Sequence, residues 1–274
     1  MSANIHPTAV ISPDAKLGSN VSVGPYTVIE GSVEIGDNTV IDSNVKIASN
    51  TVIGSDCHIF HGAVIGEVPQ DLSFKTDIFT GTKIGNGVIL REYVTLHRAT
   101  KENTFTEVGN NSMLMAFVHA GHDCKIGKNV IIANNTALAG HVSVGDCSVI
   151  SAYILIHQFC RIGKFVMIGG GATIRQDIPH YCIVSEENTV YGVNTVGLRR
   201  AGFDEKRRFN IKKAVKTYFF RHLNSRQAVA QLSEDFPGDP DIAEFIDFVS
   251  TSKRGILQGK TELNAITAGN NREE

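Results

Sequence analysis

The chain has 274 residues, of which 42% are hydrophobic and 20% charged, a composition that is ordinary for a soluble globular protein. Its net charge of −2 gives no global reason to expect binding to nucleic acid or to an anionic membrane. The five cysteines lack CxxC spacing, which argues against both a disulfide framework and a zinc knuckle. The amino terminus has no basic segment followed by an apolar run, and no window approaches the roughly 20 apolar residues of a spanning helix. We therefore expect a cytoplasmic protein without a transmembrane segment.

A repeat of six residues dominates the first two thirds of the chain. An aliphatic residue recurs at every sixth position from Ile5 to Ile65, eleven times in succession. Glycine or asparagine often follows it, and these residues tolerate the positive φ angles of tight corners. A unit of one short strand and one corner cannot bury its apolar side chain alone, so the units must coil and stack. The repeat predicts an all-β solenoid with an inward aliphatic core.

The sixfold phase is interrupted twice. One residue is added to the repeat around 66–77, and a polar stretch around 97–107 lacks the aliphatic residue but keeps the phase. Each interruption predicts a loop that protrudes from the solenoid. The phase then continues to Ile174, and we place the solenoid domain at residues 1–190.

The repeat resembles that of the hexapeptide-repeat acyltransferases, whose units form a left-handed parallel β-helix with three hexapeptides, or eighteen residues, per turn. The hand rests on this resemblance, because the general preference for right-handed crossovers points the other way. A left-handed parallel β-helix of hexapeptide repeats is therefore the expected fold of the solenoid.

The carboxy-terminal part has a different pattern. Residues 191–258 carry helical spacing, with candidate N-caps at Asp204, Ser225 and Asp239. We expect an α-helical C-terminal domain there. The segment 259–274 has no strong pattern, which is typical of a disordered tail.

Positive charge is concentrated at the start of the helical part. Between Arg199 and Arg226, ten Lys or Arg stand against only Asp204 and Glu205, a net charge of +8 that leaves −10 for the rest of the chain. A solvated basic face is the usual reason for such a pattern. A docking surface for an acidic carrier protein is the alternative. Nucleic acid is disfavoured as a partner, because no aromatic-interleaved binding motif is present.

Histidines recur near one predicted corner. His122 and His141 are nineteen residues apart and His141 and Gln158 seventeen, so a turn of eighteen residues places them on successive turns. His119 and His157 are close by in sequence. Polar residues that coincide on one face of a solenoid indicate a functional site. Two kinds of site remain open: zinc held by imidazoles, or a general base with substrate-binding neighbours.

The zinc alternative has a precedent on this scaffold. The gamma-class carbonic anhydrases share the left-handed helix and hold zinc with histidines from adjoining subunits. Their pattern has two histidines five residues apart, whereas this chain has His119 and His122 three apart and His58 and His61 three apart. The match to that zinc enzyme is poor.

A more specific resemblance comes from the order of six motifs. The chain closely resembles the UDP-N-acetylglucosamine acyltransferase family, which opens lipid A biosynthesis, in the strings GEVPQDL, REYVTLHR, GHDC, LAGHVSVGD, HQFC and YGVNTVGLRRAGF. This implies transfer of an R-3-hydroxyacyl chain from acyl carrier protein to the 3-position of UDP-N-acetylglucosamine. It also implies a homotrimer with sites between subunits, without a metal or another cofactor.

The same resemblance assigns roles to single residues. His122 is implied as the general base, Asp123 as the residue that orients it, and the backbone N–H of Gly140 as the donor that stabilises the oxyanion. Gly170 falls where the family sets acyl length, and a glycine there implies an open groove and a comparatively long chain. Substrate contacts are implied for Asp71, His119, His141, His157, Gln158, Asn194 and Arg200.

The chain departs from the family pattern at two places. Val196 stands where many members have an acidic residue, and HRAT stands at 97–100 in place of HRGT. Some relatives prefer a sugar whose 3-hydroxyl is replaced by an amine, so N-acylation of the 3-amino analogue is an alternative to O-acylation. A noncatalytic solenoid that binds a partner is a further alternative.

Overall fold

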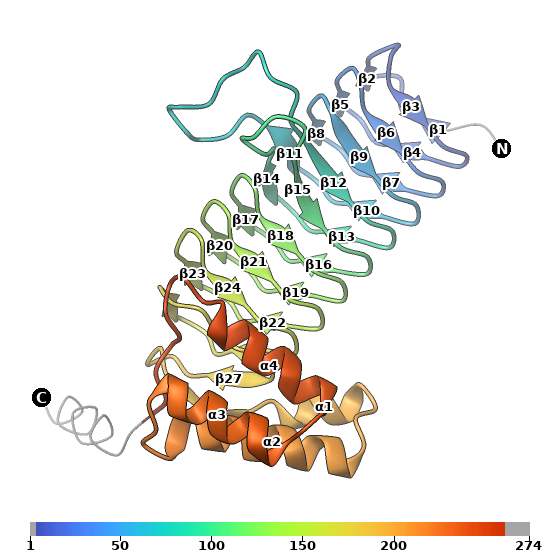
Figure 1. Cartoon of the computed structure of the whole chain (residues 1–274). Helices are drawn as coiled ribbons and strands as arrows, with labels where there is room; N and C mark the ends of the chain where they lie inside the picture. The colour runs from blue at the N-terminus through green and yellow to red at the C-terminus, as the bar shows by residue number, and fades with distance from the viewer. Residues whose placement is uncertain (1–3, 261–274) are drawn as a thin grey trace, which may run out of the picture.

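The computed structural model describes residues 4–260. Of the disordered tail expected at 259–274, residues 261–274 lie outside this range. A rod of short strands forms the first part, and helices gather at the carboxy-terminal end of the rod (Figure 1). No helix between residues 4 and 260 is long and apolar enough to cross a membrane.

The rod has three faces, and each face is a sheet of stacked strands. The first sheet contains β1 (Asn4–Ile5), β4 (Ser22–Val23), β7 (Val40–Ile41), β10 (His58–Ile59), β13 (Ile89–Leu90), β16 (Met113–Leu114), β19 (Ile131–Ile132), β22 (Val149–Ile150), β25 (Met167–Ile168), β27 (Cys182–Val184) and β28 (Val190–Val193). The second contains β2 (Val10–Ile11), β5 (Val28–Ile29), β8 (Lys46–Ile47), β11 (Val64–Glu67), β14 (Thr95–His97), β17 (His119–Ala120), β20 (Ala137–Leu138), β23 (Leu155–Ile156) and β26 (Thr173–Ile174). The third contains β3 (Lys16–Leu17), β6 (Glu34–Ile35), β9 (Thr51–Ile53), β12 (Gly81–Ile84), β15 (Phe105–Val108), β18 (Lys125–Ile126), β21 (Ser143–Val144) and β24 (Arg161–Ile162).

The repeat of the sequence is also the repeat of the structure. Away from the two loops, parallel strands of successive coils pair eighteen residues apart, as Met113 pairs with Ile131 and Ile131 with Val149. On the coils, the aliphatic residue of each unit points inward and is buried from Val23 onward, whereas Ile78 of the same sixfold register lies in the loop between β11 and β12 and is only partly buried. Many corners are turned by a residue with positive φ, and this residue is often asparagine but can be aromatic, as at Phe117. The inward ladder is the core that the periodicity predicts.

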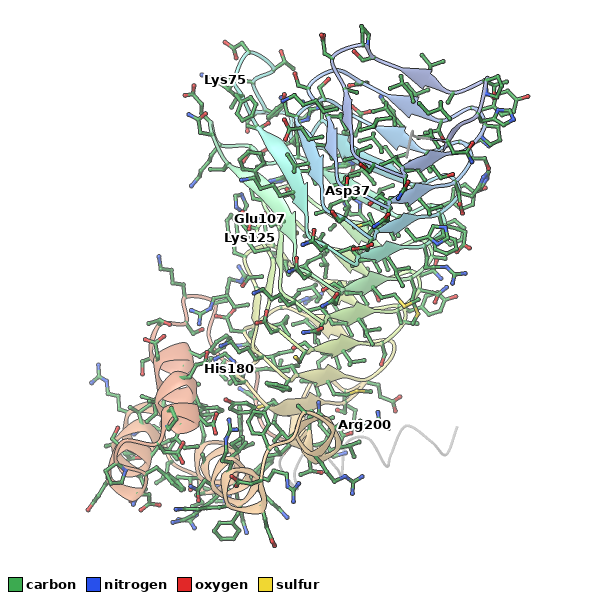
Figure 2. All side chains as sticks on the ribbon, turned by 90° about the vertical axis from the view of Figure 1, so that its right-hand side faces the viewer. Asp37, Lys75, Glu107, Lys125, His180 and Arg200 are labelled. Carbon is green, nitrogen blue, oxygen red and sulfur yellow. The ribbon has the colours of Figure 1, made fainter. Side chains whose placement is uncertain are left out.

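Two loops leave the rod. Residues 68–80 connect β11 to β12, and residues 98–104 connect β14 to β15. The longer one projects well away from the coils in Figure 1, and Lys75 marks it in the turned view of Figure 2. Both loops follow strands of the second sheet, so they leave the rod along the same edge.

The helical part contains α1 (Thr195–Arg200), α2 (Glu205–Phe220), α3 (Ser225–Asp235) and α4 (Pro240–Ser250). Asp204 and Asp239 cap α2 and α4, as the sequence predicts. The prediction of Ser225 as a cap is wrong. Asn224 caps α3 in a capping box with Gln227, because its side-chain oxygen accepts the Gln227 N–H while the Gln227 side chain accepts the Asn224 N–H.

After α4 the chain returns to the rod. Residues 251–260, here called the return segment, bind the last coil at Asp177, which is fully buried. The Asp177 N–H donates to the carbonyl oxygen of Gly255, the Leu257 N–H donates to that of Asp177, and the Ser252 hydroxyl donates to the Asp177 carboxylate at 2.8 Å. The end of the helical part is therefore fastened to the solenoid.

Candidate active site

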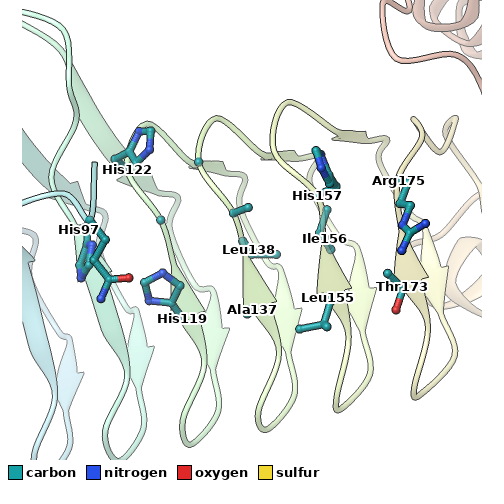
Figure 3. Close-up of a pocket in the computed structure, with 14 residues that line it drawn as sticks. His97, His119, His122, Ala137, Leu138, Leu155, Ile156, His157, Thr173 and Arg175 are labelled. Atoms are coloured by element: carbon teal, nitrogen blue, oxygen red, sulfur yellow. The ribbon is translucent and has the colours of Figure 1, made fainter. Parts of the chain in front are cut away.

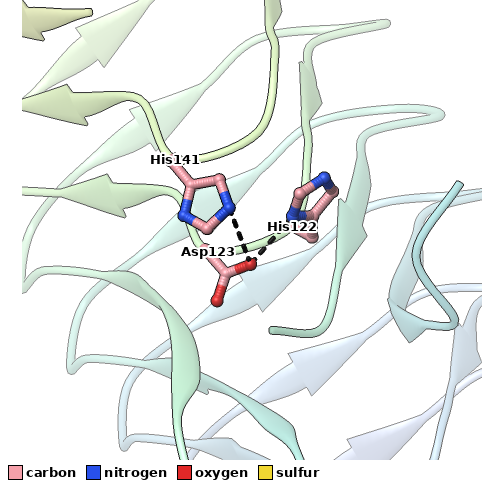
Figure 4. Close-up of side chains that lie close together, drawn as sticks. All are labelled: His122, Asp123 and His141. Atoms are coloured by element: carbon pink, nitrogen blue, oxygen red, sulfur yellow. Dashed lines mark hydrogen bonds and ion pairs between the residues drawn. The ribbon is translucent and has the colours of Figure 1, made fainter. Parts of the chain in front are cut away.

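Two histidines and an aspartate meet at one corner of the rod, on two successive coils (Figure 4). The corner after β17 carries His122 and Asp123, and Asp123 adopts a positive φ of 59°. Nδ1 of His122 lies 2.8 Å from Oδ2 of Asp123, and Nε2 of His141 lies 3.6 Å from the same oxygen. An ionised carboxylate only accepts hydrogen bonds, so Nδ1 of His122 carries the proton. In the neutral form of the ring, Nε2 of His122 is then the nitrogen with the lone pair.

The Asp123 carboxylate is held in place from the 98–104 loop. The Thr100 hydroxyl donates to Oδ2 at 2.7 Å, and the Thr100 N–H lies 3.2 Å from both carboxylate oxygens. Thr106 accepts the Asp123 N–H at 2.8 Å. Burial alone would raise the pKa of Asp123, but the hydrogen bonds from Thr100 and His122 outweigh it, and the pKa lies below its ordinary value. Asp123 is thus a fixed anion at neutral pH.

Gly140 lies directly under the His122 ring. A Cβ atom on Gly140 would come within 2.5 Å of Cε1 and 2.6 Å of Nε2 of His122. The ring occupies this position only because residue 140 has no side chain. Within residues 4–260, the Gly140 N–H has no hydrogen-bond acceptor. A free backbone donor and a basic ring nitrogen therefore lie side by side.

A pocket of about 470 Å³ opens beside this corner along the second sheet (Figure 3). His97, His119 and His122 line one end, and His157, Thr173 and Arg175 line the other. Ala137 and Leu155, which face outward on β20 and β23, contribute an apolar wall between them. The combination of a long apolar wall with polar groups at both ends suits an amphipathic ligand.

His97 and His119 form a second imidazole pair at this pocket. Their ring centroids are 5.1 Å apart, and Nδ1 of His119 lies 2.7 Å from the Thr95 hydroxyl. Burial lowers the pKa of His119 to about 4, and burial also lowers the pKa of His97. Both rings are therefore neutral at pH 7, as is His141, whose pKa burial also lowers.

Not every residue that the sequence groups together meets here. The strand register aligns position 122 with 140 and 158, so His141 lies in the column of Asp123 and Phe159. The Phe159 ring stacks on His141 at 4.6 Å between centroids. Gln158 is exposed and is absent from the pocket lining in the described chain. The spacings of nineteen and seventeen residues each differ from eighteen by one, so His141 lies one position away from the column that contains His122 and Gln158.

Asp71 lies in the 68–80 loop, where its neighbour Gln70 lines the pocket. Oδ1 of Asp71 accepts both the N–H and the hydroxyl of Ser73 at 2.8 Å, and these bonds lower the pKa of Asp71. Its charge is close enough to be felt by His141. The loop therefore brings negative charge near the imidazoles.

Three other predicted residues belong to different surroundings. Asn194 is 7% exposed and caps α1: its Oδ1 accepts the Gly197 N–H and its Nδ2 donates to the carbonyl oxygen of Phe165, both at 2.9 Å. Arg200 ends α1 and is exposed at the helical end of the rod (Figure 2), and Val196 on the same helix is also exposed. None of the three lines the pocket of its own chain.

Gly170 is exposed at a corner of a late coil. A Cβ atom there would contact only the carbonyl oxygen of Ala152, at 3.5 Å, while the positive φ of this glycine run belongs to Gly171. The turn itself therefore does not require glycine at position 170.

Three residues at the site, Thr100, His97 and Arg175, are not predicted from the sequence. Thr100 and His97 both lie in the stretch that the repeat predicts to be a protruding loop. Because that loop changes the spacing to 23 residues between Thr100 and Asp123, an eighteen-residue rule could not pair them. Arg175 follows Ile174 at the last predicted repeat, and that position was a usable signal.

The same corner also has the donor atoms of a possible metal site. One atom each from His122, Asp123 and His141 lies within 4.8 Å of the others. This is two imidazoles and one carboxylate, not the three imidazoles of the sequence hypothesis. The Thr100 hydroxyl and Nδ1 of His122 already occupy Oδ2 of Asp123, so a metal on that oxygen would have to displace these bonds.

Comparison with known proteins covers both parts of the chain. Residues 177–257 match a family described as "Udp N-acetylglucosamine O-acyltransferase; Domain 2", and residues 32–67 and 105–140 match the bacterial transferase hexapeptide repeats. Two relatives are named acyl-[acyl-carrier-protein]--UDP-N-acetylglucosamine O-acyltransferase. The protein from Thermodesulfovibrio yellowstonii is 42% identical over 93% of this chain and 99% of its own length. That from Trichlorobacter lovleyi is 45% identical over 93% and 100%.

Solved structures agree over nearly the whole length. The UDP-N-acetylglucosamine acyltransferase from Bacteroides fragilis superposes with a TM-score of 0.89 at 41% identity, covering 92% of this chain and 99% of that one. The Francisella novicida enzyme has a TM-score of 0.89 at 37% identity, covering 95% and 98%. The left-handed parallel β-helix followed by an α-helical part, expected from the sequence, is thereby confirmed.

Proposed function

The chain belongs to the family of UDP-N-acetylglucosamine O-acyltransferases, and on this basis we propose that it transfers an R-3-hydroxyacyl chain from acyl carrier protein to the 3-oxygen of UDP-N-acetylglucosamine. This reaction opens lipid A biosynthesis. The family match covers both the β-helix and the helical part.

In the proposed mechanism, His122 is the general base. Its Nδ1–H is bonded to Asp123, so Nε2 takes the proton of the sugar 3-hydroxyl as the oxygen attacks the thioester carbonyl carbon. The carbonyl oxygen becomes negative in the tetrahedral intermediate and accepts a hydrogen bond from the Gly140 N–H. Collapse breaks the carbon–sulfur bond, and the leaving thiolate receives the proton from His122. The products are the 3-O-acyl sugar nucleotide and the free thiol of the carrier protein.

The other groups are proposed to bind substrate. His119 and His141, whose rings are neutral at pH 7, and His157 line or border the pocket as hydrogen-bonding groups, with Asp71 beside them on its loop and Gln158 at the next corner. The apolar wall toward Gly170 is proposed to hold the acyl chain, and the open space at this glycine supports a long chain.

The arrangement of subunits is proposed to be a homotrimer with sites between neighbours. Arg200 and Val196 do not line the pocket of their own chain, which supports a contribution from α1 to the site of an adjoining subunit. The Asn194 side chain is used as a cap, so any contact of Asn194 with the acyl chain would be through its remaining surface. We propose the cytoplasm as the location, because carrier protein and nucleotide sugar are both water-soluble substrates.

The observation that carries the proposal is the His122–Asp123 pair over the free Gly140 N–H. The decisive experiment offers the purified protein a 3-hydroxyacyl carrier protein together with UDP-N-acetylglucosamine and its 3-amino analogue, and identifies the products by mass spectrometry. We expect the O-acyl sugar. A dominant amide would instead assign the chain to the 3-amino acceptor and point to the substitution at Val196.

A matched pair of variants tests the base. The chain has a second His–Asp pair, His58 with Asp42 at 3.1 Å, outside the pocket. His122→Ala is expected to lower kcat by about 10²-fold to 10⁴-fold, the usual contribution of general-base catalysis. His58→Ala should leave kcat close to wild type. Equal activity of His122→Ala and wild type, or loss of activity on removal of bound metal with a chelator, would contradict the metal-free mechanism.

A further inference from the structure

The return segment reaches the far end of the pocket through one side chain, Arg254. Nη2 of Arg254 lies 3.1 Å from Nδ1 of His157 and donates to the carbonyl oxygen of Arg175, also at 3.1 Å. His157 and Arg175 both line the pocket (Figure 3), whereas Arg254 does not. Arg254 therefore contacts the pocket wall from behind.

This contact determines which nitrogen of His157 carries the proton. A guanidinium group has only N–H donors, so Nδ1 of His157 must accept and the proton of the neutral ring lies on Nε2. The carbonyl oxygen of Gln158 lies 3.3 Å from the same Nδ1 and would favour the opposite tautomer. The Arg254 contact is shorter and its donor is charged, and such hydrogen bonds are the stronger kind. The Nε2–H tautomer is therefore preferred.

Arg254 is well fixed for this purpose. It lies between Ser252 and Gly255, which both bind Asp177 of the last coil. Its Nε is buried and finds no hydrogen-bond partner within residues 4–260. A buried N–H without a partner is costly and calls for an explanation. This cost is explained if the hydrogen bonds of Nη2 to His157 and to the carbonyl oxygen of Arg175 contribute to function.

We propose that Arg254 is a positioning residue of the acyltransferase: it holds His157 as the Nε2–H tautomer, so that His157 donates a hydrogen bond to an acceptor oxygen of the bound nucleotide sugar. The activity part of this inference rests on the proposed function. The helical part thereby acts on the site through a contact made by its own carboxy-terminal segment.

Nitrogen-15 NMR of histidine-labelled protein tests the tautomer directly, with His157→Asn to assign the signal. Lys253 is the matched control, because it is the exposed basic neighbour of Arg254 on the same segment. We expect an unprotonated Nδ1 on His157 in wild type and in Lys253→Met. In Arg254→Met we expect proton density to move to Nδ1, because the Gln158 carbonyl oxygen is then its nearest partner.

Steady-state kinetics test the consequence. Arg254→Met should raise KM for UDP-N-acetylglucosamine roughly tenfold, the size expected for one lost hydrogen bond, with a smaller change in kcat. Arg254→Lys keeps a charged donor and should therefore show a smaller rise in KM than Arg254→Met. Lys253→Met should leave KM unchanged. A protonated Nδ1 in wild type overturns the inference even if Arg254→Met does not fold, and so does an unchanged KM in a folded Arg254→Met.

The proposed function and the positioning role of Arg254 can be disproved independently of each other. If wild type transfers no acyl chain to either sugar, the proposed function is wrong, while the NMR result still decides whether Arg254 sets the His157 tautomer. If wild type is active and the tautomer does not respond to Arg254→Met, only the positioning role is wrong.

Discussion

At the scale of single residues, the site depends on a close approach that only glycine permits. His122 lies over Gly140 with its Nδ1 bonded to Asp123, and the Gly140 backbone has no positive φ that would itself demand glycine. Glycine at position 140 is thus required by the position of the His122 ring and not by the backbone conformation of the turn. It places the proposed base beside the proposed oxyanion donor, where both could contact one carbonyl group.

Gly140→Ala is expected to lower kcat by about 10²-fold or more while leaving the fold intact, because the new methyl group must displace the His122 ring from the Gly140 N–H. Kinetics and circular dichroism of the purified variant check this. Gly31→Ala is the control, since a Cβ at Gly31 makes only ordinary contacts of 3.4 Å or more. Wild-type kcat in Gly140→Ala would show that the ring adapts at no cost.

His119 is expected to make stability depend on pH. Its pKa is about 4 when folded against an ordinary value of 6.5, so the unfolded chain binds the proton more readily. The contribution of neutral His119 to stability is complete above about pH 6.5 and is lost as the pH falls toward 4. The difference between the two pKa values limits this contribution to the free energy of unfolding to about 3 kcal/mol. The contribution is smaller than this limit because water reaches part of the ring.

Urea unfolding of wild type and His119→Gln between pH 4 and 7.5 measures this contribution at one protein concentration. The wild-type free energy of unfolding should decrease more steeply toward acid than that of His119→Gln. His6→Gln, at an exposed histidine, should follow wild type. Parallel curves for wild type and His119→Gln would contradict the buried, neutral state of the ring.

At the scale of elements, the 98–104 loop has a task inside the site. It brings Thr100 back onto the Asp123 carboxylate, which Thr100 contacts with both its hydroxyl and its N–H. The loop thus supports Asp123, the residue proposed to orient the base. A stretch that interrupts the repeat is part of the architecture of the candidate site.

Thr100→Val is expected to lower kcat about tenfold, because the carboxylate loses one charge-assisted hydrogen bond and its hold on His122 loosens. Thr100→Ser should recover most of the activity by restoring the hydroxyl. Thr104→Val is the control in the same loop, since that hydroxyl bonds only to the Lys101 carbonyl oxygen. Rates of acyl transfer at saturating substrate provide the measurement, and equal rates for Thr100→Val and Thr104→Val would contradict the role.

The contrast between repeat and loop also shows how far sequence reasoning reaches. The periodicity predicts the coils because every sixth residue must be buried for the units to stack, and the aliphatic ladder from Val23 to Ile174 follows that rule. His122 and His141 could be paired because both lie on regular coils. Thr100 could not, because the loop lengthens the spacing to Asp123 to 23 residues, and the repeat predicts that the loop protrudes but not that it folds back onto the coil. Arg254 lies still further away in sequence, on a segment whose return to the rod depends on tertiary packing alone.

At the scale of the whole molecule, the chain is a neutral-to-acidic rod with a basic end. Part of the basic charge is structural, since Arg207 pairs with Asp241 and Lys213 with Asp235. Lys212 and Lys216 of α2 are exposed beside a hollow of about 430 Å³ that Tyr191 and Phe220 also line. These two lysines suit an acidic carrier protein, whose encounter with the enzyme would be steered by charge.

Lys216→Glu is expected to raise KM for the acyl carrier protein several-fold and to weaken its dependence on ionic strength, with kcat little changed. Lys128→Glu makes the same charge change at an exposed position on the rod and should have no such effect. Initial rates at several salt concentrations decide between them. If both variants behave alike, the carrier protein is not recognised at α2.

The two ends of the rod differ in how readily a further coil could be added to them. A stack of parallel coils has no built-in length, and each open end presents unpaired strand edges that could accept a further coil from the same or another chain. At the carboxy-terminal end β28 pairs antiparallel to β27, so the parallel register of the first sheet cannot continue, and the helical part follows. At the other end β1, β2 and β3 are edge strands of only two residues each. Growth of the rod is therefore directional, and coils added by design have to enter ahead of β27.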